Sequence, residues 1–300
     1  MIYDINGNPI DTLGKKTISM LIIGNSMAQD GLSYVPYLLK TYYPEVDFRF
    51  YLWYVAGRTL AQQYEIFQNH TKAEIFSVAE NNLAWTNYNS QKTIDDVLDS
   101  YSFDIVCMME YLTGKSSFTE NDLSGWINCQ NYIRNNYSSN ALEFITLFHA
   151  PSMNYYPVDT NFALIKTANA LILNKTIAQD MIPCGIAKYR ALATELDNLG
   201  DAGHLTVDGG HAQEGLPCLL QAECALCWIL DKLGINKSIY GNDARITTAV
   251  YNSINVPGPN LGTGVITGTD AENILAQEVA IKAYKEGKQF VIDNLFAEST

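Results

Sequence analysis

The chain has 300 residues, of which 47% are apolar and 17% charged. This composition excludes a disordered or collagen-like protein and is enough to build one large α/β domain or two small ones. Lys and Arg total 19 against 32 Asp and Glu, so the formal net charge is −13. A chain this acidic is not expected to bind nucleic acid or anionic membrane surfaces, and it disfavours highly anionic substrates.

No apolar run reaches the roughly 18 residues that a transmembrane helix needs, so no membrane span is expected. The N-terminal residues lack the basic start and apolar core of a signal peptide. Cys224 and Cys227 have Cys-x-x-Cys spacing without the second pair of a zinc ribbon, and at helical spacing they share a face with Leu220. We therefore predict buried core thiols and a reducing, cytoplasmic location, unless a signal peptide has been removed.

The first predicted strand covers residues 18–23, a run that is apolar apart from Ser19 and typical of a strand buried on both faces. It stops at Gly24-Asn25-Ser26, and a helix is predicted at about 33–42. Strand, turn and helix place Ser26 at the carboxyl end of a sheet strand. Open α/β sheets bind ligands at that edge, where a serine hydroxyl can act as a nucleophile if a base reaches it.

The rest of the chain alternates strand and helix patterns. This alternation predicts right-handed crossovers and a mostly parallel, about five-stranded sheet between two helix layers, an α/β/α sandwich with a flavodoxin-like layout. Further strands are predicted at 47–54, 104–109, 142–148 and 181–187, and further helices at 119–137, 161–179, 188–199, about 215–233 and 270–285.

Two segments do not fit this alternation. Residues 81–91 form a polar and aromatic insertion between the second and third strands, and 256–268 form a glycine- and proline-rich loop before the last helix. No linker is strong enough to divide the chain. We therefore predict a single domain over 1–300, with a short N-terminal extension (1–16) and a C-terminal appendage from about 240 to 300.

A second candidate block lies about 180 residues after Ser26, in the sequence Asp208-Gly-Gly-His211. An Asp three residues before a His, on a glycine-containing turn, can bind one imidazole nitrogen while the other faces a serine. A catalytic triad is defined by these roles and not by the order of its residues in the chain. The sequence therefore predicts a triad of Ser26, His211 and Asp208.

These blocks together resemble the SGNH, or GDSL-like, hydrolase superfamily of serine esterases over roughly residues 18–234. The resemblance implies Ser26 as nucleophile, His211 as base and Asp208 as its orienting partner, with no cofactor and no metal. It also implies an oxyanion hole that uses the backbone amides of Ser26 and of Gly57, which follows the second strand.

Two positions differ from the family pattern. Asn25 stands where the Gly-Asp-Ser block has Asp, and Glu110 stands after the third strand, where a Gly-x-Asn-Asp block normally supplies another oxyanion donor. A glutamate donates only when protonated, so either another group completes the hole or the hole has two donors. Asn25 and Glu110 are included among the expected substrate-binding residues.

The expected substrate is a small ester, with a short acyl group such as acetyl on a carbohydrate as the leading class. This expectation comes from the family resemblance and from four aromatic residues suited to stacking on sugar rings or, equally, to ordinary loop packing: Trp85, Tyr88, Tyr155 and Tyr156. Of these, Trp85 and Tyr155 are the predicted substrate-binding residues.

Two other function classes stay open. A metal-dependent hydrolase could use His204, Asp208 and His211, completed by Asp201 or Glu214, because imidazole and carboxylate ligands suit zinc or manganese. A carbohydrate- or ligand-binding module that has kept the fold and lost the chemistry is favoured by the missing third block. Turnover of an acetate ester and sensitivity to a chelator separate these classes.

Overall fold

The structure is a computed structural model of the whole chain. It describes residues in the following ranges: 17–32, 34–42, 46–79, 82–111, 117–137, 143–148, 180–183 and 216–232, together with single positions 171, 278 and 280. Strands at 82–90, 143–148 and 180–183 are described by their backbone alone.

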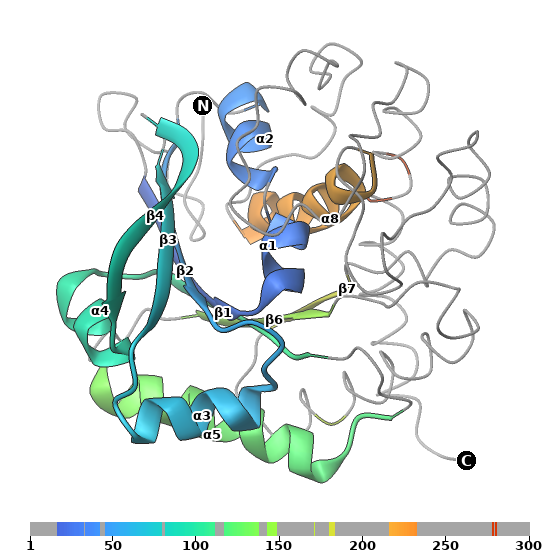
Figure 1. The fold of residues 1–300 in the computed structure, drawn as a ribbon. Helices are drawn as coiled ribbons and strands as arrows, with labels where there is room; N and C mark the ends of the chain where they lie inside the picture. The colour runs from blue at the N-terminus through green and yellow to red at the C-terminus, as the bar shows by residue number, and fades with distance from the viewer. Residues whose placement is uncertain are drawn as a thin grey trace, which may run out of the picture.

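A seven-stranded sheet in the order β4-β3-β2-β1-β5-β6-β7 forms the centre of the described fold (Figure 1). Its strands are β1 (Thr17–Gly24), β2 (Asp47–Tyr54), β3 (Ala73–Ala79), β4 (Asn82–Lys92), β5 (Ile105–Met109), β6 (Glu143–Phe148) and β7 (Asp180–Pro183). Five strands, β2-β1-β5-β6-β7, are parallel, whereas β3 and β4 form an antiparallel pair added beside β2. When these five parallel strands alone are numbered in chain order, their order in the sheet is 2-1-3-4-5. This is the flavodoxin-like order, and it confirms the predicted fold class.

Helices cover both faces of this sheet (Figure 1). One layer contains α1 (Ser26–Leu32), α2 (Val35–Tyr42) and α8 (Leu216–Lys232), and the other contains α3 (Leu60–Gln68), α4 (Ile94–Ser100) and α5 (Glu120–Asn136). The result is a three-layer α/β/α arrangement, in which β1 and β5 lie inside the sheet.

Strand β1 is apolar from Met20 to Ile23 because helices cover both of its faces. Leu21 and Ile23 belong to the core that also contains residues of α3, α4 and α5. Since successive side chains of a strand point to opposite faces, Met20 and Ile22 lie toward the other helix layer, and both are buried. The apolar run that predicted this strand is therefore explained by burial from two sides.

Three helices of the lower layer in Figure 1 begin with the same capping box. In each, the side chain of a threonine accepts a hydrogen bond from the backbone amide of the residue three positions later. The side chain of that later residue in turn accepts a hydrogen bond from the backbone amide of the threonine. The pairs are Thr59 with Gln62 in α3, Thr93 with Asp96 in α4, and Thr119 with Asp122 in α5. These boxes fix where each helix starts after its loop.

Most predicted elements that fall on described residues are present. The strand predicted at 47–54 is β2, and the helices predicted at 119–137 and about 215–233 are α5 and α8. Cys224 and Cys227 are buried in α8 and form no disulfide, as predicted. The predicted helices at 161–179 and 188–199 lie outside the described residues, apart from helical Leu171, as do the extension 1–16 and the loop 256–268.

The region between β2 and β5 was predicted least well. The polar stretch expected to be an insertion at 81–91 is a sheet strand, β4, which pairs antiparallel with β3. Neither β3 nor the helices α1, α3 and α4 were expected. In α3 and β4 many residues are polar, so their apolar periodicity is weak, and tertiary pairing decides their structure.

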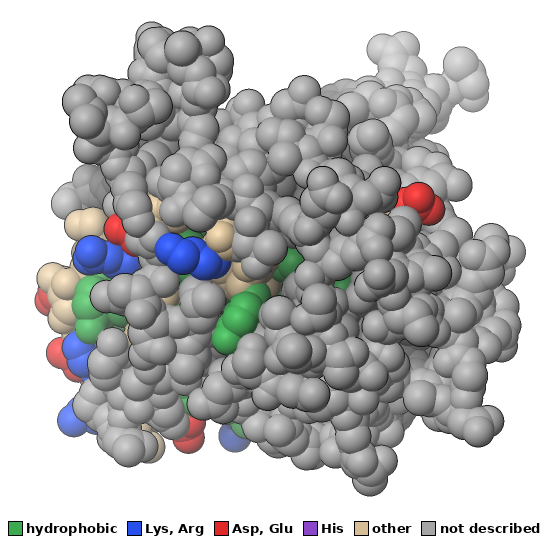
Figure 2. Space-filling model, turned by 90° about the horizontal axis from the view of Figure 1, so that it is seen from above, with side chains coloured by type: hydrophobic (Ala, Val, Ile, Leu, Met, Phe, Trp, Pro, Cys, Tyr) green, Lys and Arg blue, Asp and Glu red, His purple; other side chains and the backbone are tan. Residues whose placement is uncertain are grey.

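Among the described helices, none has the length and apolar character needed to cross a membrane. Figure 2 shows the molecule from above the view of Figure 1, where described Lys and Arg side chains lie on one side together with described Asp and Glu side chains and a few hydrophobic groups.

Candidate active site at the carboxyl end of β1

The strand order reverses at β1. The chain runs from β1 to β2 on one side and later enters β5 on the other side of β1. In open α/β sheets, ligands bind at the carboxyl ends of the strands where this reversal occurs. Ser26 follows β1, Gly57 lies in the turn after β2, and Glu110 follows β5. Three predicted site residues therefore lie at one edge of the sheet.

Ser26 is the first residue of α1 and is 6% exposed. The preceding residue, Asn25, caps this helix, because its Oδ1 accepts a hydrogen bond from the Met27 amide at 3.0 Å. The Asn25 carbonyl accepts from the Ala28 amide at 3.0 Å and from the Gln29 amide at 3.3 Å. Asn25 thus performs the turn-forming role expected of this position, and it holds Ser26 where strand becomes helix.

Residues 24–26 connect β1 to α1, and we call them the Ser26 turn. Close packing in this turn requires a glycine at position 24. A Cβ atom at position 24 would lie 2.5 Å from the Cβ of Ala28, closer than real carbon atoms approach. Helix α1 therefore folds directly back over the end of β1. This close approach is what brings Ser26 to the sheet edge without an intervening loop.

A short segment after β2, residues 55–60, lies against the Ser26 turn, and we call it the 55–60 loop. The Val55 amide donates to the Gly24 carbonyl at 3.1 Å, and Asn25 Nδ2 donates to the Arg58 carbonyl at 3.5 Å. Gly57 has a φ of +60° and is exposed. The backbone hydrogen bonds among described residues include none from the Gly57 amide, so its proposed use as an oxyanion donor stays a prediction.

Glu110 is 1% exposed and its side chain accepts hydrogen bonds from backbone amides. Its Oε1 accepts from Tyr111 N at 2.8 Å and from Leu60 N at 3.2 Å, and Oε2 lies 3.4 Å from Leu60 N. Leu60 is the first residue of α3, where backbone amides lack partners within the helix. These contacts favour a role in holding backbone over the predicted contact with substrate.

Gln63 is a buried residue at this edge that the sequence did not reveal. Its Nε2 donates to the Gly24 carbonyl at 3.1 Å, the same oxygen that the Val55 amide binds. Its Oε1 has no hydrogen-bond partner among the described residues. The available signal was a polar residue three positions after Leu60, on the face of α3 that is otherwise apolar.

The cysteines of the sheet and of α5 do not offer a competing nucleophile. Cys129 donates from Sγ to the Leu60 carbonyl at 3.2 Å, and burial raises the pKa of its thiol, which the negative charge of Glu110 raises further. Burial also raises the pKa of Cys107. Both thiols therefore stay protonated at neutral pH, whereas the thiolate is the reactive form.

The remaining predicted site residues are either outside the described residues or on β4. Asp208, His211, Tyr155 and the metal candidates Asp201, His204 and Glu214 are outside the described residues, as is Tyr156. No group of three or more potential metal-ligating side chains occurs within the described ranges. Trp85 and Tyr88 belong to β4, which β3 and β2 separate from β1. At about 4.8 Å per strand, their backbone is roughly 14 Å from β1.

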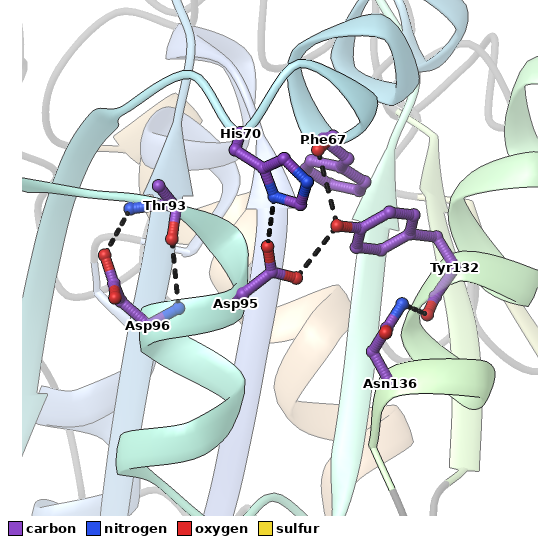
Figure 3. Close-up of polar contacts among 7 residues, drawn as sticks. All are labelled: Phe67, His70, Thr93, Asp95, Asp96, Tyr132 and Asn136. Carbon is purple, nitrogen blue, oxygen red and sulfur yellow. Dashed lines mark hydrogen bonds and ion pairs between the residues drawn. The ribbon is translucent and has the colours of Figure 1, made fainter.

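A second polar cluster joins α3, α4 and α5 (Figure 3). His70 Nδ1 lies 2.6 Å from Asp95 Oδ2, and the Tyr132 hydroxyl donates to Asp95 Oδ1 at 2.8 Å. The His70 side chain is 67% exposed. Burial, followed by the hydrogen bond to Asp95, raises the pKa of Tyr132 to about 12. This cluster contains an Asp–His pair, but its contacts among the described residues involve no serine or cysteine.

In structure, the chain is similar to a DUF4886 family protein from Bacteroides uniformis, with a TM-score of 0.65 and 15% sequence identity over 91% of this chain and 96% of that one. It also matches a gut microbial diltiazem-metabolizing enzyme, with a TM-score of 0.42 and 11% identity over 74% of this chain and 48% of that one. No family model and no curated protein matches the sequence. The first similarity supports the observed α/β fold.

Proposed function

We propose that the chain is a serine esterase of the SGNH type, with Ser26 as its nucleophile. The observation that carries this proposal is the position of Ser26, on the first turn of α1 at the carboxyl end of β1, where the strand order reverses. The resemblance of the Ser26 and Asp208-to-His211 blocks to SGNH hydrolases supports the same reaction.

In the proposed reaction, Ser26 Oγ attacks the ester carbonyl while His211 removes its proton. His211 then returns the proton to the departing alcohol, and Asp208 keeps the imidazole in the tautomer that this transfer needs. The backbone amides of Ser26 and Gly57 stabilise the oxyanion, each contributing about 3 kcal/mol. Water then hydrolyses the acyl-serine by the same steps, so the reaction consumes no cofactor.

The proposed substrate is a small, neutral ester, with an acetyl group on a carbohydrate as the leading class. The net charge of −13 disfavours a highly anionic substrate. Asn25 and Glu110, which were expected to contact substrate, instead bind backbone groups. Contacts with the alcohol portion are therefore assigned to residues outside these two, with Tyr155 retained as a candidate.

The test is turnover of a chromogenic acetate ester by wild type and by Ser26→Ala. We expect the variant to lose turnover and labelling by a fluorophosphonate, with an unchanged melting temperature. Ser124→Ala is a matched control, because Ser124 lies exposed on α5 and its hydroxyl donates to the Glu120 carbonyl at 2.8 Å. Full turnover in Ser26→Ala would rule out Ser26 as the nucleophile.

A second candidate function is a ligand-binding module without turnover. The observation in its favour is Glu110, whose side chain accepts hydrogen bonds at the position where SGNH hydrolases have an oxyanion donor. Binding of an acetylated sugar by calorimetry, with no hydrolysis by wild type, would support this function over an esterase.

The metal-dependent alternative uses His204, Asp208 and His211. It predicts that EDTA abolishes turnover and that zinc or manganese restores it, whereas the triad predicts full activity in EDTA. The triad also requires neutral His211, so activity should rise with pH through an apparent pKa near or above the free-imidazole value of about 6.5.

A further inference from the structure

The 55–60 loop is attached to two strands at once. At one end it binds the Ser26 turn, through the Val55 amide on the Gly24 carbonyl and through Asn25 Nδ2 on the Arg58 carbonyl. At the other end its last residue, Leu60, donates its amide to the Glu110 side chain after β5. Between these attachments lies Gly57, whose φ of +60° makes this a tight turn.

A carboxylate is a favourable acceptor for the Leu60 amide. The first amides of a helix have no partner within the helix and carry partial positive charge, so a negative group there is stabilised. Glu110 is 1% exposed, and a buried carboxylate needs hydrogen bonds to offset the loss of water. The amides of Leu60 and Tyr111 both supply such bonds. The contact between Leu60 and Glu110 therefore gives the helix amide a partner and the buried carboxylate a hydrogen bond.

We infer that Glu110 is a positioning residue of the proposed esterase, which holds Leu60 and thereby fixes the 55–60 loop that carries the Gly57 amide. This inference rests on the proposed function. Asn25 holds the same loop from the side of β1. Both residues that depart from the SGNH pattern thus serve the geometry of one loop, and Glu110 needs no proton to do so.

Kinetics of Glu110→Ala test this role, with Glu110→Gln as the conservative variant. An oxyanion donor acts mainly in the transition state, and a displacement of about 1 Å can cost about 100-fold in rate. We expect kcat to fall about 100-fold in Glu110→Ala with KM nearly unchanged. Glu110→Gln should recover most of kcat, because its Oε1 can still accept from both amides.

Asp122→Ala is the matched control. Asp122 is another buried carboxylate at a helix start, where its Oδ2 accepts from the Thr119 amide at 2.8 Å and the Thr119 hydroxyl at 2.7 Å. Its loss should lower the melting temperature as Glu110→Ala does, without changing kcat. An equal fall in kcat in both variants would show a general loss of stability and would overturn the positioning role.

Amide exchange at Leu60, measured by NMR, separates this inference from the proposed function. Glu110→Ala should exchange faster at Leu60 than wild type, while Asp122→Ala leaves that exchange unchanged. An unaltered Leu60 exchange rate would overturn the inference even if the esterase activity is confirmed. If wild type has no turnover, the proposed function fails, and the exchange rate still decides whether Glu110 holds the loop.

Discussion

The Ser26 turn and the turn at residues 69–71, which we call the His70 turn, are built in opposite ways. In the Ser26 turn the polar side chain is buried and binds backbone, since Asn25 reaches the Met27 amide and the Arg58 carbonyl. In the His70 turn the polar side chain is exposed and binds another side chain, that of Asp95. One arrangement fixes backbone atoms, and the other joins two helices.

The two turns also differ in how they satisfy the backbone. Gly24 is a glycine because a side chain would collide with Ala28. His70 has a positive φ of 47° without being glycine, and it ends α3 with bonds from the His70 amide to the Phe67 carbonyl and from Thr71 to Ile66. Fixed backbone donors suit oxyanion stabilisation, whereas an exposed ion pair contributes about 0–1 kcal/mol. Chemistry is therefore expected at the first turn only.

The largest effect should come from Asp208→Asn, which leaves Ser26 in place and removes the partner that orients His211. We expect turnover of the acetate ester to fall about 10,000-fold, because the imidazole takes the wrong tautomer. The corresponding change in the α4 residue that pairs with His70, Asp95→Asn, should leave turnover unchanged. A large loss of activity in Asp95→Asn would contradict the division of roles between the two turns.

The next effect concerns packing in the Ser26 turn. Gly24→Ala places a Cβ 2.5 Å from the Cβ of Ala28, so the helix must move away from the strand. Overpacking of this kind costs about 1–3 kcal/mol, measurable by urea unfolding. The double variant Gly24→Ala with Ala28→Gly removes the collision, and it should recover part of the loss. Additive losses in the double variant would show that Ala28 is not the obstacle.

The comparison also shows which parts of the fold can be predicted from sequence. The apolar runs of β1, β2 and β5 and the periodic face of α5 identify their own structure, because burial on one or both faces selects the residue types. The antiparallel pair β3–β4 could not be predicted in this way. In β4 polar and aromatic residues predominate, and its strand structure depends on pairing with β3.

The candidate site was predictable to the same extent. Ser26 and Gly57 could be placed at the sheet edge because each follows a strand with a clear apolar pattern. The roles of Glu110 and Gln63 could not be predicted, because their contacts join residues 39 to 50 positions apart in the chain. Only the folded arrangement of β1, β5 and α3 brings these groups together.

A smaller effect is expected for Tyr132→Phe, which removes the hydroxyl that donates to Asp95 at 2.8 Å and lies 3.3 Å from the Phe67 carbonyl oxygen. We expect a loss of about 1 kcal/mol in the free energy of unfolding at pH 8. The pKa of Tyr132 is raised to about 12 in the folded chain, from about 10 when unfolded. The folded state therefore holds this proton more tightly, and its contribution to stability is complete below pH 10 and lost by pH 12.

The difference in stability between wild type and Tyr132→Phe should consequently shrink as the pH rises from about 10 to 12. Urea unfolding at several alkaline pH values measures this difference, and the comparison with the variant removes the contribution of the other tyrosines. A difference that stays constant over this range would show that the folded chain does not raise the pKa of Tyr132.

The smallest effect is expected for His70→Gly, because two contributions oppose each other. Glycine adopts a positive φ without the cost of about 1 kcal/mol that a side chain incurs there, so the backbone of the His70 turn becomes more favourable. The same change removes the pair between His70 and Asp95, which contributes about 0–1 kcal/mol at an exposed site. The net change should be close to zero, whereas His70→Ala loses the pair and retains the backbone cost.

A difference of about 1 kcal/mol between His70→Gly and His70→Ala in urea unfolding would measure the backbone contribution alone. Equal stabilities would mean that the turn relaxes away from its positive φ when the pair with Asp95 is removed.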